Sequence, residues 1–161
     1  MLVEFDKLPD TSKIWIYQSN RKFYKEEIPQ IIEKVEGFLT SWNDNGIDLI
    51  ASYRFVYDRF IIFAIDETLD KISIDAIDRS IGLILHLQEE FGVELLDKLN
   101  VSFKQGEYIQ YKDLKEFQKL VKKKAVSDKT IVFNNLINIK EELENNWEIP
   151  ITESWHNRFL K

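Results

Sequence analysis

Hydrophobic residues occupy both faces of the first strongly patterned segment of the chain, Lys13–Gln18, which reads KIWIYQ. An extended chain directs successive side chains to opposite faces, so Ile14 and Ile16 share one face while Trp15 and Tyr17 share the other. The residues are mostly β-branched or aromatic, as is typical of strands. We therefore expect a β-strand that is covered on both sides.

The apolar spacing changes to three and four residues over Lys25–Trp42, which predicts an amphipathic helix. The turn-forming run Asn43–Gly46 then ends it. Two further segments, Asp48–Tyr57 and Arg59–Asp66, are expected to pair as a hairpin that turns near Asp58. The second of these is apolar nearly throughout, so it is predicted to be the central strand of a sheet.

A second helical pattern covers Asp75–Phe91 and is followed by Gly92, a residue that commonly ends helices. Residues 1–92 therefore predict the element order β-α-β-β-α. This order is the beginning of a ferredoxin-like split βαβ unit.

The pattern in the second half of the chain is less regular. Val101–Phe103 and Tyr108–Tyr111 predict a short hairpin, and Asp113–Lys124 predicts a helix that starts with a capping-box spacing. Thr130–Phe133 predicts a further strand. Asn138–Asn146 repeats the capping-box spacing and predicts a last helix.

The chain shows no internal repeat, low-complexity run or interdomain linker. We expect a single α+β domain over residues 1–161, with the βαββα unit in residues 1–92 and wrapping helices, short strands and a tail in residues 93–161.

The tail, Asn145–Lys161, is expected to be an aromatic strap over the sheet face that carries Trp15 and Tyr17. Each large ring buried there would contribute several kcal/mol at about 25 cal/mol per Å². The large apolar residues of this strap are Trp147, Ile149, Trp155, Phe159 and Leu160.

Composition narrows the function classes further. Aromatic residues make up 13% of the chain, which is typical of a well-packed globular protein. The absence of cysteine excludes disulfides, thiolate zinc sites and thiol nucleophiles. No apolar run approaches the length of a membrane span, and the first residues do not resemble a signal peptide, so a cytoplasmic location is expected. The net charge of −6 argues against a nucleic-acid partner.

Glycine and histidine usage excludes several catalytic classes. The five glycines are isolated, so the chain lacks the phosphate-cradling loop of P-loop enzymes, the dinucleotide fingerprint and the GxSxG elbow. His86 and His156 are the only histidines, which argues against a histidine-rich zinc site. We expect no cofactor and no bound metal.

An acidic cluster is the strongest enzymatic alternative. Asp58, Asp66, Asp75 and Asp78 lie at predicted turns and at a helix start, where they could converge on Mg²⁺ or Mn²⁺ and act on a phosphate-containing substrate. Aspartate also favours these positions for its own capping reasons, and this interpretation stays open beside the first. A triad-like use of Ser154 with His156 is weaker still, because residues two apart in a strand rarely reach attack geometry.

Aromatic and basic surfaces give a second alternative, an RNA-binding module. Aromatic rings on a sheet face resemble the stacking platform of RRM domains, although the glycines of that motif are absent. One predicted helix also carries a stripe of lysines, which more commonly forms a solvated face. The candidate interaction surface comprises Trp15, Tyr17, Tyr53, Phe55, Lys115, Lys119, Lys122, Trp155, His156 and Arg158.

Several blocks in order along the chain resemble a family of short, uncharacterised bacterial proteins that often carry the label "ABC transporter ATPase". These blocks are KIWIYQSNRKF, YDRFIIFAIDE, IDRSI, IVFNNLI and NNWEIPITESWHNRFL, and together they span essentially the whole chain. The resemblance implies family membership and a cytosolic setting but no activity. The chain departs from the family pattern at Ile74–Asp78, and it has no motif of an ABC-type ATPase.

These observations favour a non-enzymatic cytosolic protein that acts through protein–protein contacts, since aromatic surface candidates are abundant and no catalytic constellation is recognisable. The expected partner is a protein, and homo-oligomerisation is left open. The metal-dependent enzyme and the RNA-binding module remain the two alternatives.

Overall fold

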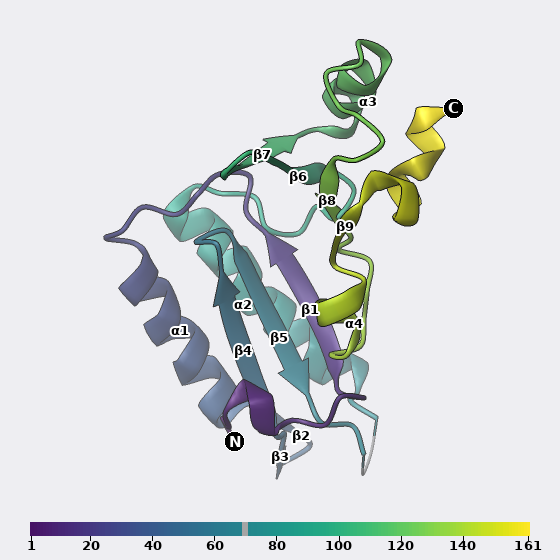
Figure 1. The fold of residues 1–161 in the computed structure, drawn as a ribbon. Coiled ribbons are helices and arrows are strands. Elements are labelled where there is room, and N and C mark those ends of the chain that lie inside the picture. Colours follow the sequence, from purple (N-terminus) through teal and green to yellow (C-terminus); the bar gives the residue numbers. More distant parts are fainter. Residues whose placement is uncertain (69–70) are drawn as a thin grey trace. The chain divides into compact units, whose positions relative to one another are not determined.

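The computed structural model describes residues 1–68 and 71–161 (Figure 1). It is a mixed α/β structure with antiparallel sheets, in agreement with the expected α+β class. The chain divides into two compact units, each with its own sheet. Unit 1 comprises Met1–Leu96 and Asn138–Lys140, and unit 2 comprises Asp97–Ile137 and Glu141–Lys161.

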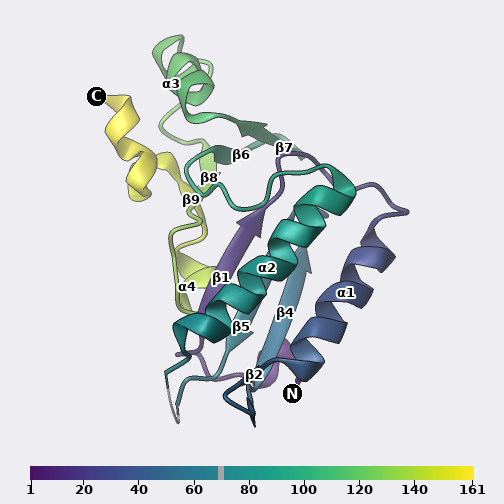
Figure 2. The same cartoon turned by 180° about the vertical axis from the view of Figure 1, so that it is seen from behind.

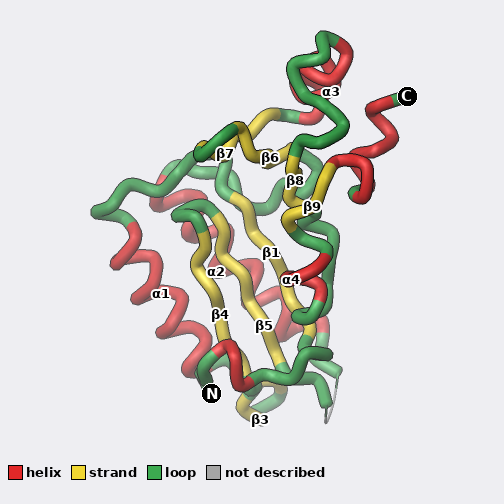
Figure 3. The backbone as a smooth tube through the Cα atoms, in the orientation of Figure 1, coloured by secondary structure: helices red, strands yellow, loops and turns green. Residues whose placement is uncertain are grey.

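The main sheet of unit 1 has the strand order β1-β5-β4, with β5 in the centre (Figure 3). Its strands are β1 (Lys13–Gln18), β4 (Ala51–Val56) and β5 (Phe60–Ile65). Both flanking strands run antiparallel to β5, and every residue of β5 is fully buried. The predicted hairpin and the predicted central strand are thus confirmed. The central position suits β5, since a strand that is apolar on both faces is stable only where both faces are covered.

Two helices cover one face of this sheet, α1 (Ile28–Ser41) and α2 (Ile74–Phe91) (Figure 2). The helix α1 begins beside Pro29, a residue tolerated in the first turn. The helix α2 begins where the Ser73 side chain accepts a hydrogen bond from the Ala76 amide, and it ends at Gly92 with φ +63°. These local signals explain why both predicted helices lie close to their expected positions.

The link between α1 and β4 contains a tight two-stranded ribbon of β2 (Asn43–Asp44) and β3 (Ile47–Asp48). Asn45 and Gly46 have left-handed backbone conformations, with φ of 53° and 83°. Asparagine and glycine adopt this conformation more readily than other residues, so the run that was expected to end the helix forms a hairpin turn.

The aromatic face of the sheet packs against the helices of its own unit. Trp15 makes an edge contact with Trp42 at a centroid distance of 6.2 Å, and Tyr17 makes one with Phe63 at 5.5 Å. Buried side chains that share this core include Ile31, Val35, Leu39, Ile84 and Leu87. The prediction that the C-terminal tail straps this face is therefore wrong: the apolar stripes of α1 and α2 meet the face instead.

A short segment, Asn138–Lys140, belongs to unit 1 although it lies late in the sequence. The Ile14 amide donates to the Asn138 carbonyl at 3.0 Å, and the Lys140 amide donates to the Ser12 carbonyl at 2.9 Å. Ile139 and Lys13 form an antiparallel bridge. The predicted start of the last helix at Asn138 is wrong, because the backbone groups of Asn138 and Lys140 bond to Ile14 and Ser12.

Only a short helix, α4 (Glu142–Asn145), remains in that region, and no side chain caps its N-terminus. Earlier in the chain, the 3₁₀ helix η1 (Phe5–Lys7) precedes β1.

The sheet of unit 2 has the order β7-β6-β8-β9 with antiparallel pairing throughout. The hairpin of β6 (Val101–Gln105) and β7 (Tyr108–Lys112) matches the predicted one, and β8 (Ile131–Phe133) matches the predicted strand. The strand β9 (Glu148–Pro150) was expected to be part of the tail. It pairs with β8, so the start of the tail is a sheet strand.

The helix α3 (Leu114–Lys122) of unit 2 starts where the Asp113 carboxylate accepts from the Glu116 amide at 2.8 Å, as its capping-box spacing predicted. Beyond β9 the chain forms two 3₁₀ helices, η2 (Ile151–Glu153) and η3 (Trp155–Leu160). Their apolar side chains pack within unit 2, together with Val101, Phe103, Phe117, Val126 and Val132.

Candidate functional site

The edge of β4 that faces away from β5 is limited on both sides by the chain itself. At one end the Ala51 amide donates to the Met1 carbonyl at 3.0 Å, and the Val3 amide donates to the Ala51 carbonyl at 2.9 Å. Beyond the other end, in the turn that follows β4, the Phe23 amide donates to the Asp58 carbonyl at 2.8 Å. These bonds limit the edge on both sides and leave the segment between them without a neighbouring strand in the described part of the chain.

Backbone groups in the middle of this edge point outward. Alternate residues of a strand direct their N–H and C=O groups to the same side, so Tyr53 and Phe55 share the outward direction of Ala51. Ser52 and Arg54 direct theirs toward β5. Within the part of the chain that the structure describes, no backbone group bonds to the outward N–H and C=O groups of Tyr53 and Phe55.

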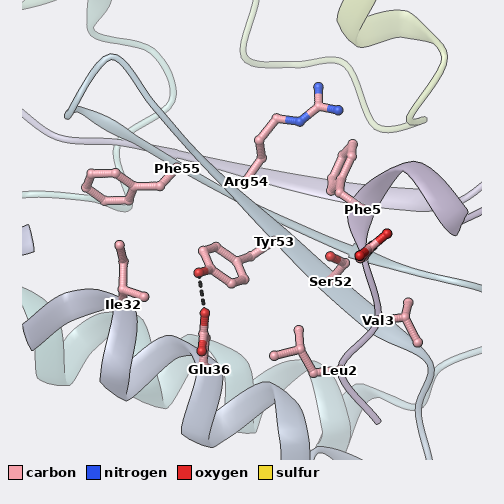
Figure 4. Close-up of a pocket in the computed structure, with 10 residues that line it drawn as sticks. Leu2, Val3, Phe5, Ile32, Glu36, Ser52, Tyr53, Arg54 and Phe55 are labelled. Atoms are coloured by element: carbon pink, nitrogen blue, oxygen red, sulfur yellow. Dashed lines mark hydrogen bonds between the residues drawn. The ribbon is translucent and has the colours of Figure 1, made fainter. Parts of the chain in front are cut away.

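A groove with a volume of about 590 Å³ lies along this free part of the edge (Figure 4). Helix α1 contributes Ile32 and Glu36 to one side of the groove, whereas η1 contributes Phe5. Tyr53 and Phe55 point to the side of α1, and Arg54 points the other way, as neighbours in a strand must. The groove thus combines apolar walls with unpaired backbone donors and acceptors.

Tyr53 is fixed by a hydrogen bond from its hydroxyl to the Glu36 carboxylate at 2.6 Å. Burial of the phenol, together with this acidic acceptor, raises the pKa of Tyr53 to about 12. The hydroxyl therefore stays protonated and remains a donor at any physiological pH. This contact holds the ring beside α1 and leaves its strand backbone accessible.

Arg54 is the cationic side chain among the residues that line the groove. Its Nη2 donates to Asp6 Oδ1 at 3.0 Å, and its guanidinium carbon lies 4.1 Å from the centre of the Phe5 ring. The Asp6 side chain is 89% exposed, so this ion pair lies in water and contributes little stability. The Phe5 ring and the Asp6 carboxylate hold the guanidinium beside the groove. The lining of the groove also includes the carboxylates of Glu4 and Glu36.

The predicted acidic cluster is spread over both ends of the unit 1 sheet. Asp58 lies in the turn before β5, and Asp66 follows its other end, where its carboxylate accepts from the Thr68 amide. Asp75 and Asp78 lie in α2. Residues 1–68 and 71–161 contain no group of three or more His, Cys, Asp or Glu side chains arranged to hold a metal.

Ser154 and His156 are in contact but buried. The distance from Ser154 Oγ to His156 Nδ1 is 2.7 Å, and these residues are 2% and 1% exposed. The imidazole stacks on Trp155 and makes an edge contact with Phe117. Burial lowers the pKa of His156 to about 4, so the ring is neutral. This pair fixes the tail within the core of unit 2.

The residues of the candidate interaction surface belong to both units and differ in exposure. Tyr17 is buried, and Trp15 packs in the core of unit 1. Within residues 1–68 and 71–161, these two rings therefore form no open aromatic platform. Exposed members in unit 2 are Lys115, Lys119, Lys122 and Arg158, whereas Trp155 is partly buried. Tyr53 and Phe55 are the members that line a groove.

Sequence analysis identified Tyr53 and Phe55 as surface candidates but missed Arg54, Glu36 and the groove itself. A charged residue inside an otherwise apolar strand, as in ASYRFV, is a common feature of edge strands and could have marked β4 as one. Which strand lies at an edge depends on pairing, however, and pairing is a tertiary property.

Comparisons with known proteins give no match, whether against family models, curated proteins or solved structures. In the described part of the chain, no helix combines the length and apolar character needed to cross a membrane.

Proposed function

We propose that the protein is a non-enzymatic interaction module that binds an extended segment of a partner protein along the free edge of β4. The observation that carries this proposal concerns Tyr53 and Phe55, which line a groove and whose outward backbone groups have no backbone partner among the described residues. Unpaired strand edges are templates for an added strand.

Strand addition matches the chemistry of the groove. Main-chain hydrogen bonds to the edge supply affinity, and pockets beside alternate side chains supply specificity. The ring of Phe55 and the side chain of Ile32 offer an apolar surface on the side of α1. The length of the free edge is short, because the contacts at Ala51 and Asp58 limit it. A segment of a few residues would fill it.

We also propose ferredoxin-like connectivity for unit 1, with residues 97–137 inserted between α2 and a last edge segment. The antiparallel bridge between Ile139 and Lys13 supports this interpretation, because it adds a fourth position beside β1 in the order β1-β5-β4. A cytoplasmic location and membership of the resembling bacterial family remain proposals.

The test is selection of short random peptides displayed on phage against the full chain. We expect wild-type protein to enrich peptides and Phe55→Pro to reduce their binding by about tenfold, the effect of one lost hydrogen bond with an unsatisfied partner. Proline removes the outward N–H of residue 55 and leaves the bonds from β4 to β5 in place.

Phe55→Val is the matched control, since it also loses the ring contact with Phe23 but keeps the N–H. It should bind the selected peptides more tightly than Phe55→Pro does. Thermal melts of both variants check that the fold persists. If no peptide is enriched, or if valine and proline have equal effects, binding along the β4 edge is wrong.

A further inference from the structure

Resting on the proposed function, we infer that the β4 groove selects a segment with a carboxylate side chain facing Arg54 and an apolar side chain next to it, facing Phe55 and Ile32. The inference concerns the chemistry of the partner segment. This chemistry follows from geometry, since each side of an added strand would face a different set of groove side chains.

An added strand would place one side chain directly across from Arg54. Side chains at such positions lie about 4.5–5.5 Å apart at their Cβ atoms, within reach of an arginine–carboxylate pair. The guanidinium is oriented over Phe5 and donates through Nη2 to Asp6. A guanidinium has five N–H donors, so donors remain for a second carboxylate.

The neighbouring positions of the added strand face α1, on the other side of the sheet. Apolar surface from Phe55 and Ile32 lines that side. The Glu36 carboxylate, which accepts from Tyr53, lies there too and repels acidic groups. An acidic side chain is therefore favoured at the position facing Arg54 and disfavoured at its immediate neighbours. This alternation distinguishes the expected segment from one that is acidic throughout.

A second copy of this chain fits the edge poorly. In a symmetric antiparallel pair that bonds all the outward groups, Tyr53 of one copy lies opposite Phe55 of the other. Arg54 then lies directly opposite Arg54 of the second copy. Like charges at such positions destabilise a pair of strands. The charge on β4 thus disfavours self-pairing and favours an acidic segment from another protein.

The experiment compares peptides selected by the wild-type chain with those selected by Arg54→Glu and Arg54→Gln. Wild type should enrich Asp or Glu at one position with apolar residues beside it, and Arg54→Glu should enrich Lys or Arg there. Arg54→Gln should remove the charge preference. For one selected acidic peptide, we expect Arg54→Glu to weaken binding by about tenfold or more.

Each other outcome overturns the inference in a distinct way. The selected peptides could lose affinity for Phe55→Pro and yet have the same composition for all Arg54 variants. That result would overturn the acidic specificity and leave the proposed function standing. Failure to enrich any peptide would overturn both. Concentration-dependent dimerisation that Phe55→Pro abolishes would identify a second copy as the occupant. Melting temperatures of the Arg54 variants check that each remains folded.

Discussion

The polar pair of Ser154 and His156 forms between residues close in the sequence and is buried by residues that lie far from it in the sequence. Ser154 and His156 are two residues apart and in hydrogen-bond contact, yet Phe117 supplies part of the covering surface. Their burial turns a candidate catalytic pair into a structural one. Because the buried histidine is neutral, the free energy of unfolding should depend on pH.

We expect the free energy of unfolding to fall as the pH is lowered from about 6.5 toward 4 because of His156. The unfolded histidine binds a proton in this window, whereas burial lowers the pKa of the folded one to about 4 and keeps it neutral. Stability is therefore fully present above the unfolded pKa and is lost as the pH falls through the window. The loss is on the order of 2–3 kcal/mol.

Urea unfolding at several pH values measures this effect. The control is the double variant Ser154→Ala/His156→Phe, which retains an aromatic ring and leaves no unpaired hydroxyl. Its stability should fall less over the same range, since the buried histidine is absent from the variant. Parallel pH profiles of the two proteins would contradict a buried neutral histidine.

At the scale of elements, the ends of the helices follow local chemistry. Gly92 ends α2 with φ +63°, where its N–H donates to the Gln88 carbonyl. Gly37 lies inside α1, and a Cβ atom at that position would meet nothing within 4 Å. Glycine thus favours the observed backbone conformation at position 92 and weakens the helix at position 37.

We expect Gly92→Ala to destabilise the protein by about 1 kcal/mol, because an L-residue is strained in the left-handed conformation. Gly37→Ala is the matched variant, and it should stabilise by about 0.5–1 kcal/mol through helix propensity. Thermal or urea unfolding of the two variants measures both. Changes of the same sign would show that one of the two backbone assignments is wrong.

The elements also show the limit of local patterns. The segment at Asn138 has a capping-box spacing and still forms an extended edge segment, because the free edge of β1 offers backbone partners. The short strand β9 lacks a clear alternation and forms because β8 pairs with it. In both places tertiary pairing overrides propensity.

At the scale of the whole molecule, the chain separates into two units that differ in charge. Unit 1 carries 11 Lys or Arg and 18 Asp or Glu residues, whereas unit 2 carries 11 and 10. The acidic balance of the protein therefore belongs to unit 1. The C-terminal tail contributes β9 and the fully buried Ile151 to unit 2.

Deleting Trp147–Lys161 is expected to unfold unit 2, since the deletion removes β9, Ile151 and the rings around Phe117. Amide NMR signals of Phe103 and Val132 should lose their dispersion. Deleting only Leu160 and Lys161, which are exposed, is the control and should leave the spectrum and the melting temperature nearly unchanged. Retained dispersion after the longer deletion would contradict the structural role of the tail.

The sequence by itself determined the elements whose signals are local. The period-two strands, the two long helices with their stop residues and the capped helix α3 are set by side-chain alternation, helical spacing and backbone conformational preferences. The absence of cysteine and of phosphate-binding motifs likewise excluded whole chemistries without a structure.

Only the tertiary structure decided which surfaces stay open. The aromatic strand face is covered by α1 and α2, Asp58 and Asp66 lie at opposite ends of β5, and the Ser154–His156 pair is buried. In the described part of the chain, the backbone bonds to Ala51 and to the turn residue Asp58 and leaves the outward groups of Tyr53 and Phe55 between them without a backbone partner, beside the groove. Strand order and coverage depend on contacts between distant residues, and the pattern within one segment does not contain them.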